Sequence, residues 1–515
     1  MLISFGIWPL LAFIAVNLQE GIELGRATFL TVIVSGSISV FLMLMHCAFR
    51  NKSGIRVYYL FPVIVVSFYF FNDIMNVLGD LGFTRYRYRI LFLVGLFLIV
   101  SGLVLRWTRS ENFRLIIASV GVAMFVAGGV SLGHAAIVAS QGSVTSTPAE
   151  GSGMVSQSEV LLRIPEPKFL EEDSRFESTR ERPNIYYLLP DGHVSPEVLR
   201  SEFGFDPSEF VGSLRNLGFR VYDRGWSNYP ATRTSVSSTM SMQYLYRPDN
   251  LDEKEEIRFI DERIILGENR VMEALAERGY KYVHIPNGFI ARWNCGPYVD
   301  HCIKKPESLL DVSETDVTFL VRTPIPILVQ TLFRTFVWAG RITEFTDFAE
   351  MLPVDVEPPY LLVFHTMAPH SPYRFTAECE SIQVFQDISE ALYLGQVQCI
   401  DKQIVLAVKR IIETDPEAII VLQSDHGFWT HEQSDTPMLD WTERRKRITM
   451  SFLGAYRLPK KCQDLLPERM TQVNAFRIVL GCIDGKEVPL LENHSYLPIW
   501  VYHPGAENKV YEWSP

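Results

Sequence analysis

Aspartate and histidine residues follow three separate β-rich runs in the C-terminal half of the sequence. The runs are IYYLL at 185–189, YLLVF at 360–364 and AIIVLQ at 418–423. The residues that follow them are Asp191, His365, His370, Asp425 and His426. These residue types bind zinc or manganese, and such an ion can activate an oxygen nucleophile and hold a phosphoryl group during transfer. One Asp-Gly pair after a strand is an ordinary turn, but three such strand ends together predict a divalent metal site.

The elements between these runs show how the side chains could be brought together. Short apolar runs alternate with helical patterns from residue 183 onward, which is typical of an α/β fold. We predict a parallel sheet covered by helices on both faces, with ligands bound beyond the carboxyl ends of its strands.

A hydroxyl-rich segment, SNYPATRTSVSS at 227–238, could supply a nucleophile. A proline followed by such a run indicates a loop entering a helix, whose free N–H groups and dipole stabilise an anion. A threonine there could attack phosphorus while the helix end holds the phosphoryl oxygens. The alternative is an ordinary helix cap, and only the nearby aspartates and histidines favour the nucleophile.

Several longer pieces carry a resemblance to a known family. They are PNIYYLLPDG, FGFDPSEFVGSLRNLGFRVYDRGWSNYPATRTSVSS, HTMAPHSPYRF, VLQSDHG and VNAFRIVLG. From about Pro183 to about Tyr496, the sequence resembles the sulfatase-like branch of the alkaline phosphatase superfamily. With its preceding apolar segments, it is similar to lipoteichoic-acid synthase and the lipid A phosphoethanolamine transferases. The resemblance therefore implies an alkaline-phosphatase-like fold.

The resemblance also implies roles for particular residues. The implied ligands of the divalent metal ion, Zn²⁺ or Mn²⁺, are Asp191, Thr232, Asp425 and His426. Thr232 would also be the nucleophile, because Thr232-x-x-Ser235 matches the family pattern, while Thr234 remains an alternative. His370 would contact the substrate phosphate or protonate the leaving oxygen.

Some residues depart from the family pattern. Arg233 and Trp429 have no counterpart, and we expect them to shape a particular substrate pocket. Two interpretations of His431 remain open: it is either a further substrate-contacting histidine or a surface histidine. Sulfatases proper need Cys-x-Pro-x-Arg, or Ser in place of Cys, and no such motif surrounds Thr232. Phosphoryl chemistry is therefore favoured over sulfate ester hydrolysis.

The leading functional hypothesis is a phosphoryl-group transferase. Thr232 would take a phospho-head group, of phosphoethanolamine or phosphoglycerol type, from a phospholipid, and a cell-surface glycan or lipid would accept it. One alternative is a phosphodiesterase or sulfatase-like hydrolase, in which water replaces the acceptor. Another is a non-catalytic scaffold in polysaccharide export, although the four implied ligands are all present.

The N-terminal part contains five apolar stretches long enough to cross a bilayer, which takes about 20 residues. They lie near Leu2–Leu18, Ala27–Phe49, Val57–Leu78, Ile90–Trp107 and Phe113–Ala139. With the N-terminus inside, the cytoplasmic loops hold six basic residues against four on the other side. We expect a multi-pass protein of the cytoplasmic (inner) membrane, with residues 1–139 in the membrane, a Ser/Gly/Pro-rich linker at 140–182 and a catalytic domain at 183–515 in the periplasm or outside the cell.

Cysteine usage and charge bear on the compartment and the partners. Six of the seven cysteines lie in the C-terminal half, where 295/302, 379/399 and 462/482 are close in sequence. In an oxidising compartment this number indicates three disulfides, although sequence alone does not fix their pairing. The net charge of −11 argues against a nucleic-acid partner, because phosphate backbones require clustered cations.

Overall fold

The structure is a computed structural model of the whole chain. It describes residues 59–81, 86–117, 182–245, 267–287, 295–305, 342–382, 389–429, 437–498 and 510–514, with residue 264 and scattered positions up to 130, but without 297 and 372. The described residues fall into two compact units, an N-terminal one and one that begins at Arg182. The predicted linker at 140–182 lies almost wholly outside the described residues.

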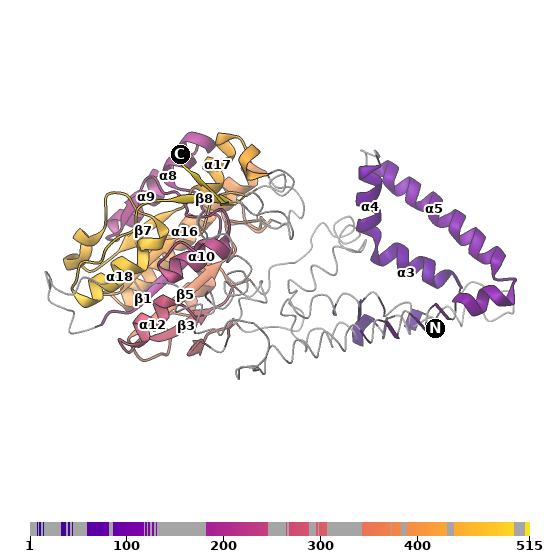
Figure 1. Cartoon of the computed structure of the whole chain (residues 1–515), viewed down its shortest axis with the longest axis horizontal. Coiled ribbons are helices and arrows are strands. Elements are labelled where there is room, and N and C mark those ends of the chain that lie inside the picture. The colour runs from indigo at the N-terminus through magenta and orange to yellow at the C-terminus, as the bar shows by residue number, and fades with distance from the viewer. Residues whose placement is uncertain are drawn as a thin grey trace. The chain divides into compact units, whose positions relative to one another are not determined.

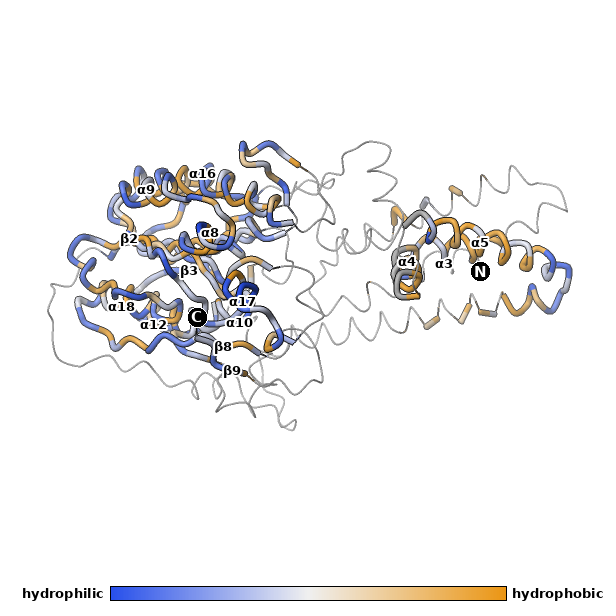
Figure 2. Tube along the Cα trace, turned by 90° about the horizontal axis from the view of Figure 1, so that it is seen from above, coloured by the Kyte–Doolittle hydropathy of each residue, from blue (hydrophilic) through white to orange (hydrophobic). Residues whose placement is uncertain are grey.

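Three helices form the continuously described part of the N-terminal unit: α3 (Phe61–Tyr69), α4 (Phe71–Asp80) and α5 (Tyr86–Trp107). Hydrophobic residues predominate along α5 (Figure 2). Within the described residues, Tyr88–Trp107 is the one helical segment long and apolar enough to cross a membrane. It agrees closely with the predicted span Ile90–Trp107.

The predicted span Val57–Leu78 needs correction, because it is not one continuous helix. The helix is interrupted at Phe70, where φ is −106° and ψ is 21°, and α3 and α4 are separate helices. Averaged hydropathy hid a change of character, since α3 carries no charge whereas α4 carries Asp73 and Asp80. The remaining three predicted spans lie wholly or partly outside the described residues.

A seven-stranded sheet organises the C-terminal unit (Figure 1), with the strand order β2-β7-β6-β1-β5-β3-β4. The strands are β1 (Ile185–Pro190), β2 (Arg220–Tyr222), β3 (Lys281–Ile285), β4 (His301–Cys302), β5 (Tyr360–Thr366), β6 (Ile419–Gln423) and β7 (Gly454–Arg457). β1, β5 and β6 lie side by side at its centre and are buried throughout. Continuous burial explains why these strands read as unbroken apolar runs.

The expectation of a purely parallel sheet is wrong for one strand. β7 pairs antiparallel with both β6 and β2, whereas β6, β1, β5, β3 and β4 are mutually parallel. The chain reaches β7 at the carboxyl edge of the sheet, where Leu453 N–H donates to His193 O and Leu453 O accepts from Ser424 N–H. A strand that starts at this edge can only run back across the sheet, so the sheet is mixed.

Helices cover both faces of the sheet, as predicted. Side chains from α10 (Thr232–Ser241), α12 (Arg270–Ala276) and α18 (Ala475–Asp484) pack with Tyr187 and Val363 on one face. Side chains from α9 (Ser208–Asn216), α15 (Phe345–Glu350) and α16 (Glu390–Thr414) pack with Leu188 and Phe364 on the other. The alternation of side chains along each strand divides the core into these two layers.

Smaller elements complete the unit. They are α8 (Pro196–Phe203), the 3₁₀ segments η6 (Met438–Asp440), η7 (Lys460–Leu465) and η8 (Gln472–Asn474), α17 (Glu443–Met450) and a hairpin-like pair of β8 (Ser495–Pro498) with β9 (Val510–Trp513).

Three disulfides join the cysteines that are close in sequence. The bonds are Cys295–Cys302, Cys379–Cys399 and Cys462–Cys482. The predicted number is thereby confirmed, and the structure supplies the pairing that the sequence left open.

Candidate active site

The carboxyl edge of the central strands brings three potential metal ligands together. Asp191 directly follows β1, His365 lies near the end of β5 and Asp425 follows β6 by two residues. One ligand atom of each lies within 4.8 Å of the others, and all three residues are buried. The strand register accounts for this, because Leu189 pairs with His365 and Asp191 N–H donates to Thr366 O.

Asp425 is oriented by two backbone donors. Its Oδ1 accepts from Gly192 N–H at 3.0 Å and from His426 N–H at 2.9 Å. Gly192 has a φ of +74°, and a Cβ atom there would lie 3.4 Å from Gly427 O, so glycine suits this turn on both counts. With Oδ1 occupied, Oδ2 of Asp425 is turned toward the imidazole of His426, 3.3 Å from Nε2.

The tautomer of His426 follows from its other nitrogen. Nδ1 lies 2.8 Å from Gly427 O, and a carbonyl oxygen only accepts, so Nδ1 carries the hydrogen. The Nε2 lone pair then faces three oxygens: Asp425 Oδ2, Asp191 Oδ1 at 3.8 Å and Thr232 Oγ1 at 3.3 Å. The His426 nitrogen and these three oxygens thus lie close together, and most of them are hydrogen-bond acceptors.

Acceptors gathered in this way fit a bound cation. Asp191 Oδ1 and Asp425 Oδ2 are buried and accept no hydrogen bond from any residue that the structure describes. Burying unsatisfied carboxylate oxygens is costly unless a cation or donor compensates them. Oxygen and imidazole ligands suit a divalent metal such as zinc or manganese. The residues present therefore fit a divalent metal ion.

Histidines also affect the ionisation of Asp191. Burial opposes ionisation of the carboxyl, but His370, His365 and His426 outweigh it, and the pKa of Asp191 lies below its ordinary value. Asp191 is thus favoured as a carboxylate, the form that binds a metal.

Thr232 is the first residue of α10. Because its Oγ1 lies 3.3 Å from His426 Nε2, the structure brings the predicted nucleophile close to the predicted ligands. Three neighbouring contacts shape the entry to this helix: Ser235 N–H donates to Ala231 O, Ser235 Oγ donates to Tyr229 O, and Thr234 Oγ1 donates to Ala231 O at 3.0 Å. The two candidate hydroxyls therefore differ in surroundings. Thr232 faces His426, while Thr234 bonds its own backbone.

His370 lies close to the same group of residues. Its N–H donates to Asp191 O, and its Nδ1 lies 2.6 Å from Ser371 O, which leaves Nε2 as the exchangeable nitrogen. The imidazole rings of His370 and His426 are 6.5 Å apart. Gln396 of α16 holds the segment by donating to Pro369 O and His370 O.

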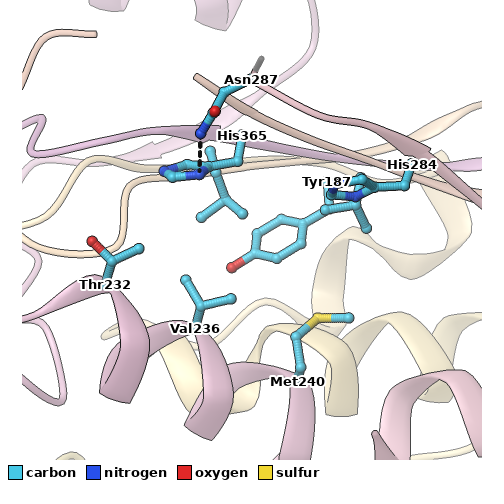
Figure 3. A pocket seen from close by; sticks show the side chains of 9 residues that line it. Tyr187, Thr232, Val236, Met240, His284, Asn287 and His365 are labelled. Carbon is cyan, nitrogen blue, oxygen red and sulfur yellow. Dashed lines mark hydrogen bonds between the residues drawn. The ribbon is translucent and has the colours of Figure 1, made fainter. Parts of the chain in front are cut away.

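His365 and Asn287 are site residues to which the sequence analysis gave no role. Figure 3 shows the Asn287 amide directed at the His365 ring, with Nδ2 3.4 Å from Nδ1. His365 Nε2 lies 3.3 Å from Asp191 Oδ2. Both residues fit the strand-end pattern that located Asp191, since Asn287 comes two residues after β3 and His365 directly follows the apolar run 360–364. The pattern places both at the carboxyl edge of the sheet without giving either a role.

A narrow cavity of about 20 Å³ lies beside Thr232, between α10 and the strands. Thr232, Val236 and Met240 project from one side of α10 toward Tyr187, His284 and His365 (Figure 3). The volume suffices for one or two waters, not for a lipid chain. Of the remaining predicted positions, Arg233 is half-buried on α10, Trp429 lies beside His426, and His431 is outside the described residues.

Comparison with known families decides the family of this chain. A sequence model of the sulfatase family matches residues 210–479, which is more than half of the 515 residues. The chain belongs to the sulfatase family. This sulfatase-family protein is an enzyme of the alkaline phosphatase/sulfatase superfamily, and the resemblance stated from sequence is confirmed. The matched region includes Thr232, His365, His370, Asp425 and His426, while Asp191 precedes it.

Solved structures similar to this sulfatase-family protein include a periplasmic domain, a phosphoethanolamine transferase and a synthase. The C-terminal periplasmic domain of EcEptC from Escherichia coli is 13% identical, with 66% of this chain and 95% of that chain covered and a TM-score of 0.40. Lipooligosaccharide phosphoethanolamine transferase A (EptA) from Neisseria meningitidis is 15% identical, with coverages of 94% and 95% and a TM-score of 0.40. The lipoteichoic acid synthase LtaP from Listeria monocytogenes is 10% identical, with coverages of 66% and 83% and a TM-score of 0.39. A comparison with curated proteins gave no match.

Proposed function

We propose that this protein is a metal-dependent phosphoryl-group transferase that uses Thr232 as its nucleophile. The observation that carries the proposal is the position of Thr232 Oγ1 at the start of α10, 3.3 Å from His426 Nε2. Asp191 and Asp425 direct carboxylate oxygens to the same nitrogen. A threonine hydroxyl among such groups differs from a helix cap, whose oxygen would bond the helix backbone.

Asp191, Asp425, His426 and the Thr232 hydroxyl would hold the metal, with His365 as a further candidate ligand. A divalent cation there would lower the pKa of the Thr232 hydroxyl, and its positive charge would stabilise the phosphoryl oxygens. The first N–H groups of α10 belong to the helix turn that Thr232 begins, and they would bind the phosphoryl oxygens that do not react.

Two displacements complete the reaction. In the first, the deprotonated Oγ1 of Thr232 forms a bond to phosphorus, the bond to the donor's leaving oxygen breaks, and protonated His370 gives that oxygen a proton from Nε2. In the second, an acceptor hydroxyl loses its proton to His370 Nε2, and its oxygen displaces Thr232 Oγ1 from phosphorus, so that Thr232 is again an alkoxide and His370 is again protonated. Because Nδ1 of His370 is held by Ser371 O, the ring stays oriented while Nε2 exchanges the proton.

The proposed donor is a phospholipid with a head group of phosphoethanolamine or phosphoglycerol type, and the proposed acceptor is a cell-surface glycan or lipid. The apolar helix within α5 supports a membrane location, where lipid donors are at hand. The three disulfides support an oxidising compartment for the catalytic domain. We accordingly propose the domain boundaries 1–139, 140–182 and 183–515, with a multi-pass membrane part in the cytoplasmic (inner) membrane and a periplasmic or extracellular catalytic domain.

The first test uses purified full-length protein. Metal content is measured by elemental analysis, and intact mass is measured after exposure to phospholipid vesicles, with Thr232→Ala as the matched variant. We expect stoichiometric metal and a mass increase that the variant lacks. Absence of both would overturn the catalytic proposal in favour of a non-catalytic scaffold.

The second test follows a phospholipid labelled in its head group. Transfer predicts label on a glycan or lipid acceptor, whereas label released into solution would replace the transferase proposal with a hydrolase. Release of sulfate from aryl sulfates serves as a control for sulfuryl chemistry, which the lack of Cys-x-Pro-x-Arg around Thr232 disfavours.

A further inference from the structure

Trp429 connects the segment that carries Thr232 with the segment that carries His426. Its indole Nε1 donates to Pro230 O at 2.6 Å, across 199 positions of sequence. Pro230 is two residues before Thr232, and Trp429 is three residues after His426. The Trp429 ring also lies 6.1 Å from the His426 ring, at an angle of 63°.

The start of α10 depends on contacts of this kind. Its cap residue, Ala231, is extended, and no side chain of the described residues caps the helix there. The hydroxyls of Thr234 and Ser235 shape the turn by bonding backbone atoms within the same segment. Ser235 Oγ also lies 3.5 Å from Gln472 Oε1, so it takes part in the connection that Gln472 makes on the buried side.

The side chains of Gln472 and Trp429 connect the two segments. Gln472 donates to Ser424 O and Asp425 O and accepts from Asn228 N–H, so it fixes the buried side. Trp429 fixes the other side, nearer to Thr232. A second ring supports Trp429, since Trp441 lies 5.8 Å away in an edge-on arrangement and is 3% exposed.

We propose that Trp429 is a positioning residue that holds the Thr232 hydroxyl against His426 Nε2 through its bond to Pro230 O. This inference rests on the proposed function, in which Thr232 is both nucleophile and metal ligand. A displacement of about 1 Å at a reacting oxygen costs up to about 100-fold in rate, so one long-range hydrogen bond can matter here.

The test is a double-mutant cycle on metal affinity. Zn²⁺ is titrated calorimetrically into metal-free full-length wild type, Trp429→Phe, Thr232→Ala and the double variant. Trp429→Phe keeps an aromatic ring and removes the N–H donor. We expect Trp429→Phe to weaken Zn²⁺ binding by about 10-fold in the wild-type protein. In the Thr232→Ala background, the same change should weaken Zn²⁺ binding by less than about 2-fold.

Trp513→Phe is the matched control. Trp513 belongs to the same apolar cluster as Trp441, and its indole donates to Glu443 Oε2 at 3.3 Å, away from Pro230. We expect this variant to bind Zn²⁺ like wild type. Should Trp429→Phe not fold, Trp429→Tyr replaces it, since it also retains a ring without an indole donor.

Turnover supplies a second readout. With a labelled phospholipid, Trp429→Phe should lower kcat by about 10-fold and leave KM within about 2-fold. A raised KM with unchanged kcat would mean that the ring binds substrate instead, and this would overturn the proposal. The proposal would also be overturned if Trp429→Phe lowered Zn²⁺ affinity equally in wild type and in Thr232→Ala, or did not lower it at all. No effect of Thr232→Ala on affinity or adduct formation would instead overturn the proposed function.

Discussion

The two halves of the candidate site are built in different ways. Asp191, His365 and Asp425 are carried by neighbouring parallel strands whose backbones pair residue by residue. Thr232 is carried by a helix on one face of the sheet, and side chains from distant segments hold the start of that helix. The strand-borne half therefore follows from the sheet, whereas the helix-borne half depends on a few specific hydrogen bonds.

This difference indicates where the site tolerates change. Displacing a strand end requires breaking a ladder of hydrogen bonds inside a continuous core. Displacing Thr232 requires the loss of only a few long-range contacts. Substitutions in each half can therefore separate loss of chemistry from loss of positioning.

Replacing Thr232 by alanine should have the largest effect. Loss of a nucleophile removes the covalent route entirely, and we expect kcat to fall by about 10⁴-fold or more. Thr234→Ala is the matched control, because Thr234 Oγ1 bonds Ala231 O in the same helix turn. Turnover of labelled phospholipid measures both. Comparable losses in the two variants would contradict the assignment of Thr232.

The strand-borne half was largely predictable from sequence. Asp191 and Asp425 stand directly after or close to apolar runs, and in a parallel sheet such positions meet at one edge. The same reasoning located His365 at the edge but could not give it a role, because the distance to Asp191 depends on the exact register.

Other features could not be predicted, because they depend on contacts across the fold. The bonds of Gln472 and Trp429 join segments that are about 200 or more residues apart. The antiparallel direction of β7 follows from the path of the preceding loop, which short apolar runs do not reveal. Phe70 divides the third predicted span, because its backbone leaves the helical conformation, and hydropathy averaged over the whole span does not reveal such a local change.

His370→Gln tests the residue that is proposed to transfer protons. Glutamine keeps a polar side chain but cannot exchange a proton, so we expect kcat to fall by about 10²–10⁴-fold with metal content unchanged. His494→Gln is the control, since that imidazole lies next to Glu512, outside the site. Loss of bound metal in His370→Gln would indicate a ligand role instead.

Gln472→Leu tests the buried connection between the two halves. The change leaves Asp425 O and Asn228 N–H without their present partner, and we expect a loss of about 1–3 kcal/mol in stability. Displacement of Thr232 from the strand-borne ligands should lower kcat by about 10–100-fold. Gln403→Leu, a buried change on α16 away from the site, should leave kcat unchanged, because the amide it removes contacts only Cys399 Sγ among the described residues. Denaturant titration and turnover together distinguish the two outcomes.

Two of the disulfides offer the smallest and most closely matched comparison. Cys379–Cys399 and Cys462–Cys482 each span 20 residues, so chain entropy predicts a similar contribution of about 3 kcal/mol from each. Only Cys399 lies on α16, one turn after Gln396, which holds the His370 segment. Replacing both cysteines of a pair by serine should therefore lower the melting temperature similarly in the two proteins. Activity should fall, by about 3-fold, only when Cys379–Cys399 is lost, because the imidazole of His370 is then less well fixed. Equal activity in both serine variants would show that α16 holds His370 without help from this disulfide.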